Sequence, residues 1–181
     1  MIAPKLLAVV GTKKSGKTTV VEQIISGLTK KGFHIGPIKH IHHPDFTIDT
    51  KGTDTWRHSN AGSRMVAAFA KNETALVIKD DLESVLPSIL EFMMKQPLDA
   101  IVIEGLHSSM GQRNDIFKIV TAHEPQDLQQ RLHSIVPPIL AISGIIAEKA
   151  SSVPDSNVPV INAMTNSPKL VEKIENEVLR K

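Results

Sequence analysis

The sequence predicts an α/β fold in which helices cover both faces of a doubly wound, mostly parallel sheet. Short apolar runs alternate with segments of helical periodicity along almost the whole chain, and this alternation is typical of βαβ units. The run at residues 100–103 is apolar without interruption, as expected of a central strand buried on both faces. At 181 residues the chain is long enough for one substantial core, so we expect a single domain over residues 1–181.

The first predicted unit is a strand, a loop and a helix. Residues 6–10 are apolar and read as the strand. After the loop, apolar residues recur at helical spacing, namely Val20, Val21, Ile24, Ile25 and Leu28. Gly32 follows the last of them and marks the expected end of the helix.

The segment between this helix and the central strand is predicted to be less regular. The expected elements are, in chain order, a strand over 33–38, a loop over 40–53, a helix over 54–61, hairpin strands over 65–69 and 75–78, and a helix over 82–94. Pro37 favours an edge position for its strand, because proline has no N–H to donate. Thr53 or Asp54 is the expected cap of the first of these helices. Pro87 has to lie in the first turn of the second, where a missing N–H is tolerated.

The segment after the central strand continues the alternation. The expected elements are a strand over 116–120, a helix over 124–132, a strand over 139–142, a surface connection over 147–156, a strand over 158–161 and a closing helix. Ser167 is the expected cap of the closing helix, with Pro168 at its first position. The predicted topology is therefore a sheet built from consecutive βα units.

Composition excludes several classes of protein. The formal net charge of +2 is too small to make nucleic acid the main partner, and 3% aromatic residues argue against base-stacking platforms. The absence of cysteine excludes disulfides and thiolate metal sites. The N-terminal apolar run leads straight into a glycine loop, so we read it as a core strand rather than a signal peptide, and no run reaches the length of a membrane span. We therefore expect a cytoplasmic protein that has no membrane partner.

Residues 11–18 carry the most specific motif, G-x-x-x-x-G-K-[ST], known as the Walker A or phosphate loop. Gly11 and Gly16 allow the tight turn that points successive N–H groups at a polyphosphate. Lys17 can reach the outer phosphates, and the Thr18 hydroxyl can ligate magnesium. The predicted nucleotide-binding residues of this segment are Gly11, Thr12, Lys13, Lys14, Ser15, Gly16, Lys17, Thr18 and Thr19. The chain is thus predicted to be a P-loop NTPase-type protein that binds a nucleoside triphosphate and Mg²⁺.

A carboxylate partner for the metal is expected at the end of a neighbouring buried strand. Glu104 follows the central run and is the candidate, either as a metal ligand or as the group that orients the attacking water. Gly105 after it would let the backbone pass close to the phosphates. We therefore predict Lys17 and Glu104 as the catalytic residues, and Thr18 and Glu104 as the metal-binding residues.

A second polar cluster follows the second predicted strand. Lys39 and His40 stand at its end, and His42 and His43 come directly after. Three interpretations remain open, namely a metal site, recognition of an anionic ligand, and solvated imidazoles in a polar loop. Further along stand the acidic candidates for an approach to magnesium, Asp45, Asp49 and Asp54, of which the last two are equally plausible as turn and cap residues.

Several blocks together resemble the MobB family of molybdopterin guanine dinucleotide biosynthesis. They are the loop from Gly11 to Thr19, Ile38-Lys39-His40-x-His42-His43, Ile48-Asp49-x-x-Gly52-x-Asp54-Thr55-Trp56-Arg57, Ala61-Gly62 and Val102-x-Glu104-Gly105. The second and third blocks are far more specific than the phosphate loop. The sequence departs from the family's pattern at Ser143-Gly144, where the family tends to have an Asp near the base, and Thr12 replaces a lysine that is typical of MinD-like proteins.

The resemblance implies a GTP-binding adaptor with weak, Mg²⁺-dependent GTPase activity that forms homodimers. Such proteins are thought to assist the guanylyltransferase that joins GMP to molybdopterin in molybdenum cofactor biosynthesis. On this view Lys39, His40 and Asp54 line the crevice that takes GTP phosphates or the phosphate of molybdopterin. The local motifs do not distinguish GTP from ATP.

Two other functions are compatible with the same residues. A small-molecule kinase would use the phosphate loop for ATP and the histidine-rich segment for its acceptor. A metallochaperone-like nucleotide switch would carry a metal ion on His40, His42 and His43.

Overall fold

The computed structural model describes residues 3–43, 45–153 and 156–180. These residues fall into two compact units, one formed by Met1–His40 with Met93–Lys181 and the other by Ile41–Phe92. We call them the first and the second unit. None of the helices found in the described ranges combines the length and the apolar character needed to cross a membrane.

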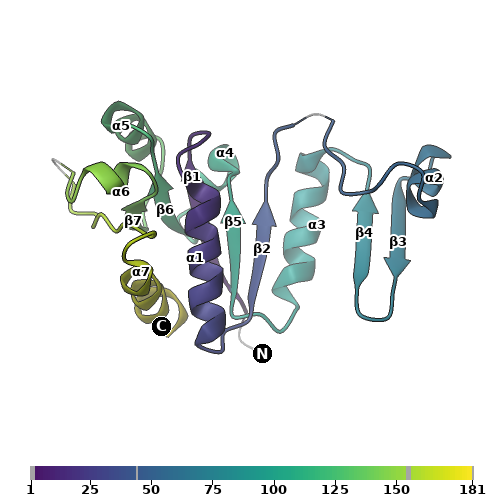
Figure 1. Ribbon diagram of the computed structural model, residues 1–181, viewed down its shortest axis with the longest axis horizontal. Helices are drawn as coiled ribbons and strands as arrows, with labels where there is room; N and C mark the ends of the chain where they lie inside the picture. The colour runs from purple at the N-terminus through teal and green to yellow at the C-terminus, as the bar shows by residue number, and fades with distance from the viewer. Residues whose placement is uncertain (1–2, 44, 154–155, 181) are drawn as a thin grey trace. The chain divides into compact units, whose positions relative to one another are not determined.

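The first unit is built on a parallel sheet with strand order β2-β5-β1-β6-β7 (Figure 1). Its strands are β1 (Lys5–Gly11), β2 (Ile35–Lys39), β5 (Ala100–Glu104), β6 (Phe117–Thr121) and β7 (Ile139–Ser143). All residues of β5 are buried, which confirms the central strand predicted from its continuous apolar run. The chain places its strands on both sides of β1, so the predicted doubly wound α/β fold is confirmed.

Helices of the first unit bury the apolar stripes that their sequences predict. α1 (Lys17–Lys30) buries Val20, Val21, Ile24 and Leu28, and Figure 1 shows this helix in front of β1. α7 (Ser167–Ile174) buries Leu170, Val171 and Ile174 and packs beside α1. α7 continues into one π-helical turn, η1 (Glu175–Leu179), in which Val178 is buried. These stripes and the strands form one core.

The second unit has very little core of its own. It contains α2 (Asp54–Asn60), the antiparallel hairpin of β3 (Met65–Phe69) and β4 (Thr74–Ile78), and most of α3 (Leu82–Met94). Among its described residues, Val66 is the one buried apolar side chain. Thr53, one of the two predicted caps, is the N-cap of α2, and its Oγ1 accepts a hydrogen bond from the Trp56 N–H at 3.4 Å.

Several local predictions are wrong. Pro87 lies inside α3 and not in its first turn. The N-cap of α7 is Asn166, without a side-chain cap, and Ser167 is the first helical residue. The strand predicted over 158–161 is reduced to a single bridge between Val160 and Ile142, because Pro159 has no N–H with which to extend the ladder.

Short helices were also missed. α4 (His107–Gly111) follows the central strand, and α6 (Ile146–Lys149) overlaps the start of the predicted surface connection, two residues of which lie outside the described ranges. α5 (Pro125–His133) confirms the predicted short helix, and the structure places Pro125 in its first turn. Both missed helices are too short to show helical periodicity in the sequence.

Candidate functional site

The phosphate loop, residues 11–18, joins the end of β1 to the start of α1. Gly16 is the N-cap of α1 and has a φ of 90°, a conformation that favours glycine. Lys14 also has a positive φ, 61°. The first N–H groups of α1 and those of the loop therefore point to the carboxyl edge of the sheet, where parallel α/β folds bind their ligands.

The ends of β6 and β7 contact this loop through hydrogen bonds and close backbone packing. Ser15 is fully buried, and its Oγ lies 2.6 Å from the Thr121 Oγ1 at the end of β6. The Ile145 N–H donates to the Ser15 carbonyl at 3.1 Å. A Cβ on Gly144 would lie 2.1 Å from that carbonyl oxygen, and one on Gly11 would lie 2.1 Å from the Thr121 carbonyl oxygen. Both glycines are thus required for the close approach of loop and strands.

A side chain from α5 holds the loop at its second residue. The Thr12 Oγ1 donates to the Asp127 Oδ2 at 2.6 Å. The same carboxylate oxygen accepts from the His123 N–H at 3.1 Å, and Arg131 lies 3.7 Å from the other oxygen. Asp127 therefore joins Thr12 to α5.

Lys17 is folded over the loop that carries it. Its Nζ donates to the Gly11 carbonyl at 3.1 Å and to the Thr12 carbonyl. Burial lowers the pKa of the Lys17 ammonium, Glu104 opposes this shift, and Arg131 lowers the pKa further. A negatively charged phosphate in the loop would offset this crowding of positive charge.

The two predicted metal ligands are in contact. The Thr18 Oγ1 donates to the Glu104 Oε1 at 2.7 Å, and Glu104 is 7% exposed. The register of the sheet places Glu104 beside Val9, two residues before the loop begins. A hydroxyl and a carboxylate oxygen fit Mg²⁺, which takes one or two protein ligands and completes its shell with phosphate and water. The donor set therefore suits a magnesium ion bound with a nucleotide.

Lys39 and His40 also reach this site. Lys39 pairs with Glu104 in the register of β2 and β5, and its Nζ donates to the Glu104 Oε1 at 2.8 Å and to the Thr18 Oγ1 at 2.9 Å. The His40 N–H donates to the Glu104 carbonyl at 3.0 Å. A Cβ on Gly105, whose φ is 89°, would lie 3.3 Å from the His40 Cβ. Predicted residues from the loop, β2 and β5 thus lie together.

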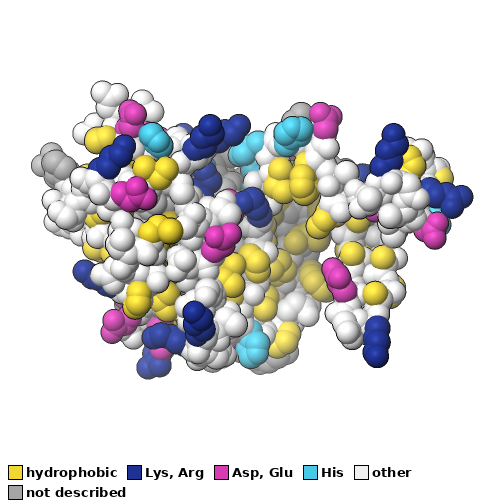
Figure 2. Space-filling view, viewed as in Figure 1, with side chains coloured by type: hydrophobic (Ala, Val, Ile, Leu, Met, Phe, Trp, Pro, Cys, Tyr) yellow, Lys and Arg dark blue, Asp and Glu magenta, His cyan; other side chains and the backbone are white. Residues whose placement is uncertain are grey.

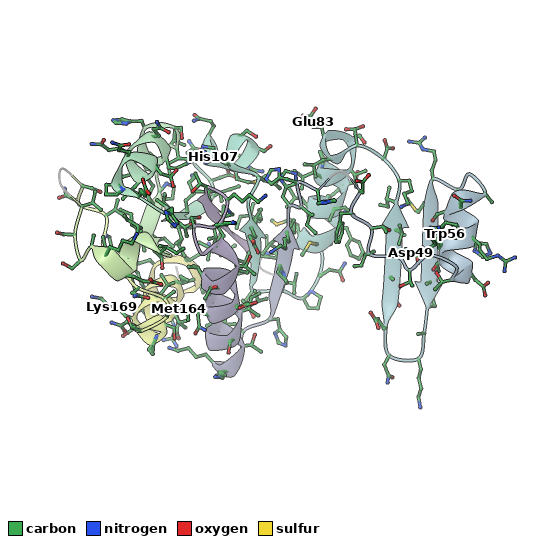
Figure 3. All side chains as sticks on the ribbon, turned by 45° about the horizontal axis from the view of Figure 1, so that its top comes forward. Asp49, Trp56, Glu83, His107, Met164 and Lys169 are labelled. Carbon is green, nitrogen blue, oxygen red and sulfur yellow. The ribbon has the colours of Figure 1, made fainter. Side chains whose placement is uncertain are left out.

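The remaining predicted carboxylates and histidines belong to the second unit. Asp49 (Figure 3) forms a turn before α2, where its Oδ1 accepts from the Thr55 Oγ1 at 2.8 Å and from the Thr53 Oγ1 at 3.0 Å. The hydrogen bond from Thr55 lowers the pKa of Asp49. Asp54 pairs with Arg57 on the surface of α2, at 3.2 Å. The structure thus gives Asp49 the turn role left open by the sequence, whereas the N-cap of α2 is Thr53 and not Asp54.

The histidine-rich segment forms no metal cluster in the part of the chain that the structure describes. There, no group of three or more His, Cys, Asp or Glu side chains is arranged to hold an ion. His42, His43 and Asp45 follow β2 in the second unit. The metal-site interpretation of this segment therefore gains no support.

Three side chains near the loop were not indicated as site residues by any sequence motif. Thr121, Asp127 and Arg131 contact the loop or act on Lys17, yet each stands in an ordinary strand or helix pattern. His107, labelled in Figure 3, begins α4, and its Nε2 lies 3.0 Å from the Ser134 Oγ. Burial, reinforced by the charge of Arg131, lowers the pKa of His107. Only the spatial arrangement reveals these residues, because each is distant in sequence from the loop.

Two polar residues at or beyond the end of β7, Ser143 and Asn162, show no arrangement that would select a base. The Asn162 Oδ1 accepts from the Met164 N–H at 2.8 Å and from the Thr165 N–H at 3.3 Å, so it stabilises its own turn. Ser143 is fully buried at the end of β7. The described geometry therefore suits phosphate binding at the loop and contains nothing that selects a base.

Known proteins resemble this chain over most of its length. A putative molybdopterin-guanine dinucleotide biosynthesis adapter protein of Methanocaldococcus jannaschii is 36% identical over 117 residues, which are 64% of this chain but only 46% of that relative. The adapter protein of Escherichia coli is 30% identical over 132 residues, 72% of this chain and 75% of the relative.

Solved structures share the fold. The crystal structure of Bacillus subtilis MobB superposes with a TM-score of 0.69, covers 96% of this chain and 98% of that one, and is 24% identical. A MobB homologue from Bacillus stearothermophilus gives a TM-score of 0.65 at 20% identity, with 94% and 98% of the chains covered. The family model for molybdopterin guanine dinucleotide synthesis protein B matches residues 6–138. The chain therefore belongs to the MobB family.

Proposed function

We propose that this protein binds GTP with Mg²⁺ and acts as an adapter in the synthesis of molybdopterin guanine dinucleotide. The observation that carries the proposal is the contact between Thr18 and Glu104, 2.7 Å apart, beside a phosphate loop built on glycines. Family membership supports the pathway, since relatives carry the name of adapter protein in this biosynthesis. The partner we propose is the guanylyltransferase that joins GMP to molybdopterin, with molybdopterin itself as a further ligand.

The chain's own residues account for phosphate binding. Backbone N–H groups of the loop and of the first turn of α1 donate to the phosphate oxygens, and the Lys17 ammonium leaves its loop carbonyls for the outer phosphates. Thr18 and Glu104 would hold Mg²⁺, which neutralises phosphate charge when bound. Glu104 can also orient a water for attack on the γ-phosphate. We propose slow hydrolysis, because the loop itself supplies no glutamine or arginine.

The second unit supports a homodimer. Met65, Phe69 and Leu76 share one face of the hairpin, since residues paired across antiparallel strands point the same way. Their side chains are 56%, 81% and 52% exposed, and Figure 2 shows hydrophobic side chains on the surface of this region. An apolar face of this kind marks an interaction surface. We propose that a second copy of the chain covers it.

We also propose that residues 1–181 act as one nucleotide-binding domain in the cytoplasm. The second unit begins directly after Lys39 and His40, which contact the phosphate-loop region. Guanine nucleotides are available in the cytoplasm, and this fits the proposed ligand.

The sharpest test of nucleotide binding is the variant Lys17→Ala, titrated with a fluorescent GTP analogue in the presence of Mg²⁺. We expect the dissociation constant to rise at least ~100-fold, because the variant removes the ammonium that the phosphate-loop motif supplies to the outer phosphates. Lys30→Ala, at the exposed far end of the same helix, is the matched control and should bind like the wild type. A parallel titration with an ATP analogue tests whether the site prefers guanine to adenine.

The adapter role needs its own measurement. The guanylyltransferase is assayed with and without the protein, for both complex formation and cofactor nucleotidylation. Stimulation that is lost in the Lys17→Ala variant is the expected result. GTP binding without any interaction with the guanylyltransferase would refute the adapter role and leave a nucleotide-binding protein of another kind.

A further inference from the structure

Lys39 makes a contact that the proposed function does not explain. Its Nζ, the Thr18 Oγ1 and the Glu104 Oε1 form a closed triangle with sides of 2.7, 2.8 and 2.9 Å. The ammonium is therefore bound to the same two oxygens that are suited to magnesium.

An ammonium and a metal ion compete at these oxygens. The Thr18 hydroxyl donates a hydrogen bond to Glu104 and accepts one from Lys39, so one of its two lone pairs is engaged and only the other is left for a metal. Bonds from Mg²⁺ to oxygen are about 2.1 Å long, which would bring the ion close to the ammonium if both shared these partners. Two positive charges at such a separation repel strongly in a partly buried site.

The exposure of the three side chains shows which of them can move. The Lys39 side chain is 47% exposed, whereas that of Glu104 is 9% exposed. Lys39 also stands at the end of β2, an edge strand, on a flexible four-carbon stem. Glu104 lies in the central strand, and Thr18 is fixed in the first turn of α1. Lys39 is the group that can leave.

We propose that Lys39 is an exchangeable counter-cation of the magnesium site. In the absence of the metal its ammonium compensates the buried Glu104 carboxylate and keeps the Thr18 hydroxyl in place. Mg²⁺ arriving with the nucleotide displaces the ammonium, which is then released toward solvent or toward the phosphates. Lys39 thereby raises the magnesium concentration that nucleotide binding requires. This inference rests on the proposed function, since it assigns a role to a residue of the same site.

The test is a magnesium titration of the binding of a fluorescent GTP analogue, with the midpoint as the readout. Lys39→Met removes the ammonium and retains the length of the stem. We expect the magnesium concentration at the midpoint to fall about tenfold. A change of this size corresponds to one charge-assisted hydrogen bond, which the metal no longer has to break. Lys39→Arg retains the charge, and its midpoint should stay within about threefold of the wild type.

A matched control exists at the other end of α1. Lys31 pairs with Glu175 much as Lys39 pairs with Glu104, with side chains 43% and 7% exposed, but it stands away from the phosphate loop. Lys31→Met should therefore leave the magnesium midpoint unchanged. Lys39→Gln is a second variant in case the methionine variant does not fold, which its circular dichroism spectrum would show.

The outcomes are distinct. An unchanged or higher midpoint in Lys39→Met and Lys39→Gln, with wild-type binding intact, would overturn the counter-cation role alone. Failure of the wild type to bind the nucleotide at any magnesium concentration would overturn the proposed function itself. A lower midpoint in both variants, with no change in Lys31→Met, supports the exchange.

Discussion

Lys17 lies among charges of both signs. After burial, which lowers its pKa most, Glu104 and Asp127 favour the charged ammonium, and Arg131 and Lys39 disfavour it. Three cationic side chains therefore act at one end of the sheet with two carboxylates to balance them. A polyphosphate would complete this balance, which gives the site an electrostatic preference for anions.

His107 gives a prediction for the dependence of stability on pH. Burial lowers its pKa in the folded protein below the ordinary value of 6.5, so the unfolded chain binds more protons as the pH falls through that value. Its contribution to the free energy of unfolding is present above pH 6.5 and is lost below it. The free energy of unfolding, measured with urea, should fall less between pH 7.5 and pH 5.5 in His107→Gln than in the wild type. Equal losses in both proteins would contradict this.

Asp127 shows a limit of prediction at the scale of single residues. The motif identified Thr12 as part of the loop, but nothing in the pattern of α5 marked Asp127 as its partner, 115 residues away. Glu104 could be predicted because it ends a strongly apolar strand, and such strand ends meet the loop in parallel sheets. Asp127 could not, because an acidic residue in the first turn of a helix is ordinary.

At the scale of elements, α1 and α7 approach each other at a glycine. A Cβ on Gly27 would lie 2.4 Å from the Val171 Cγ2, and Val171 is 3% exposed. Alanine is better than glycine in a helix by about 1 kcal/mol, but overpacking a core costs about 1–3 kcal/mol, and the branched valine has little freedom to move. Packing should therefore outweigh helix propensity.

We expect Gly27→Ala to lower the free energy of unfolding by about 1–2 kcal/mol, measured by urea denaturation. The double variant Gly27→Ala with Val171→Ala should be more stable than the sum of the two single changes predicts, because the second removes the clash. Ser26→Ala, on the exposed side of α1, is the control and should be neutral or stabilising. A Gly27→Ala protein more stable than the wild type would show that the helices can separate without cost.

The same scale shows where element prediction succeeds. Strands β1, β5, β6 and β7 are apolar over most of their length and were predicted within one or two residues. The 158–161 segment has the same composition but pairs only at Val160, since Pro159 interrupts its hydrogen bonding. Apolar composition thus predicts a buried strand only where the backbone N–H groups are available to donate hydrogen bonds to a neighbouring strand.

At the scale of the whole molecule, the apolar face of the hairpin predicts a dimer. A charged side chain introduced on that face should dissociate it. Phe69→Lys places an ammonium on the proposed interface, and burying it unpaired is costly. We expect the dissociation constant of the dimer to rise at least ~100-fold, measured by sedimentation velocity over a range of concentrations. Asn72→Lys, in the exposed turn of the hairpin, adds the same single charge outside that face and should remain dimeric. A wild type that is monomeric at every concentration would refute the dimer.

The sequence by itself determined the parallel α/β fold, the phosphate loop and the family resemblance. These depend on local features, namely glycine conformations, apolar periodicity and contiguous motifs, which are legible along the chain. Only the tertiary structure decided that Thr18, Lys39 and Glu104 form one hydrogen-bonded triangle. Its members come from α1, β2 and β5, and the order β2-β5-β1 brings them together. Pairing between distant strands is a property of the folded sheet, so no local pattern records it.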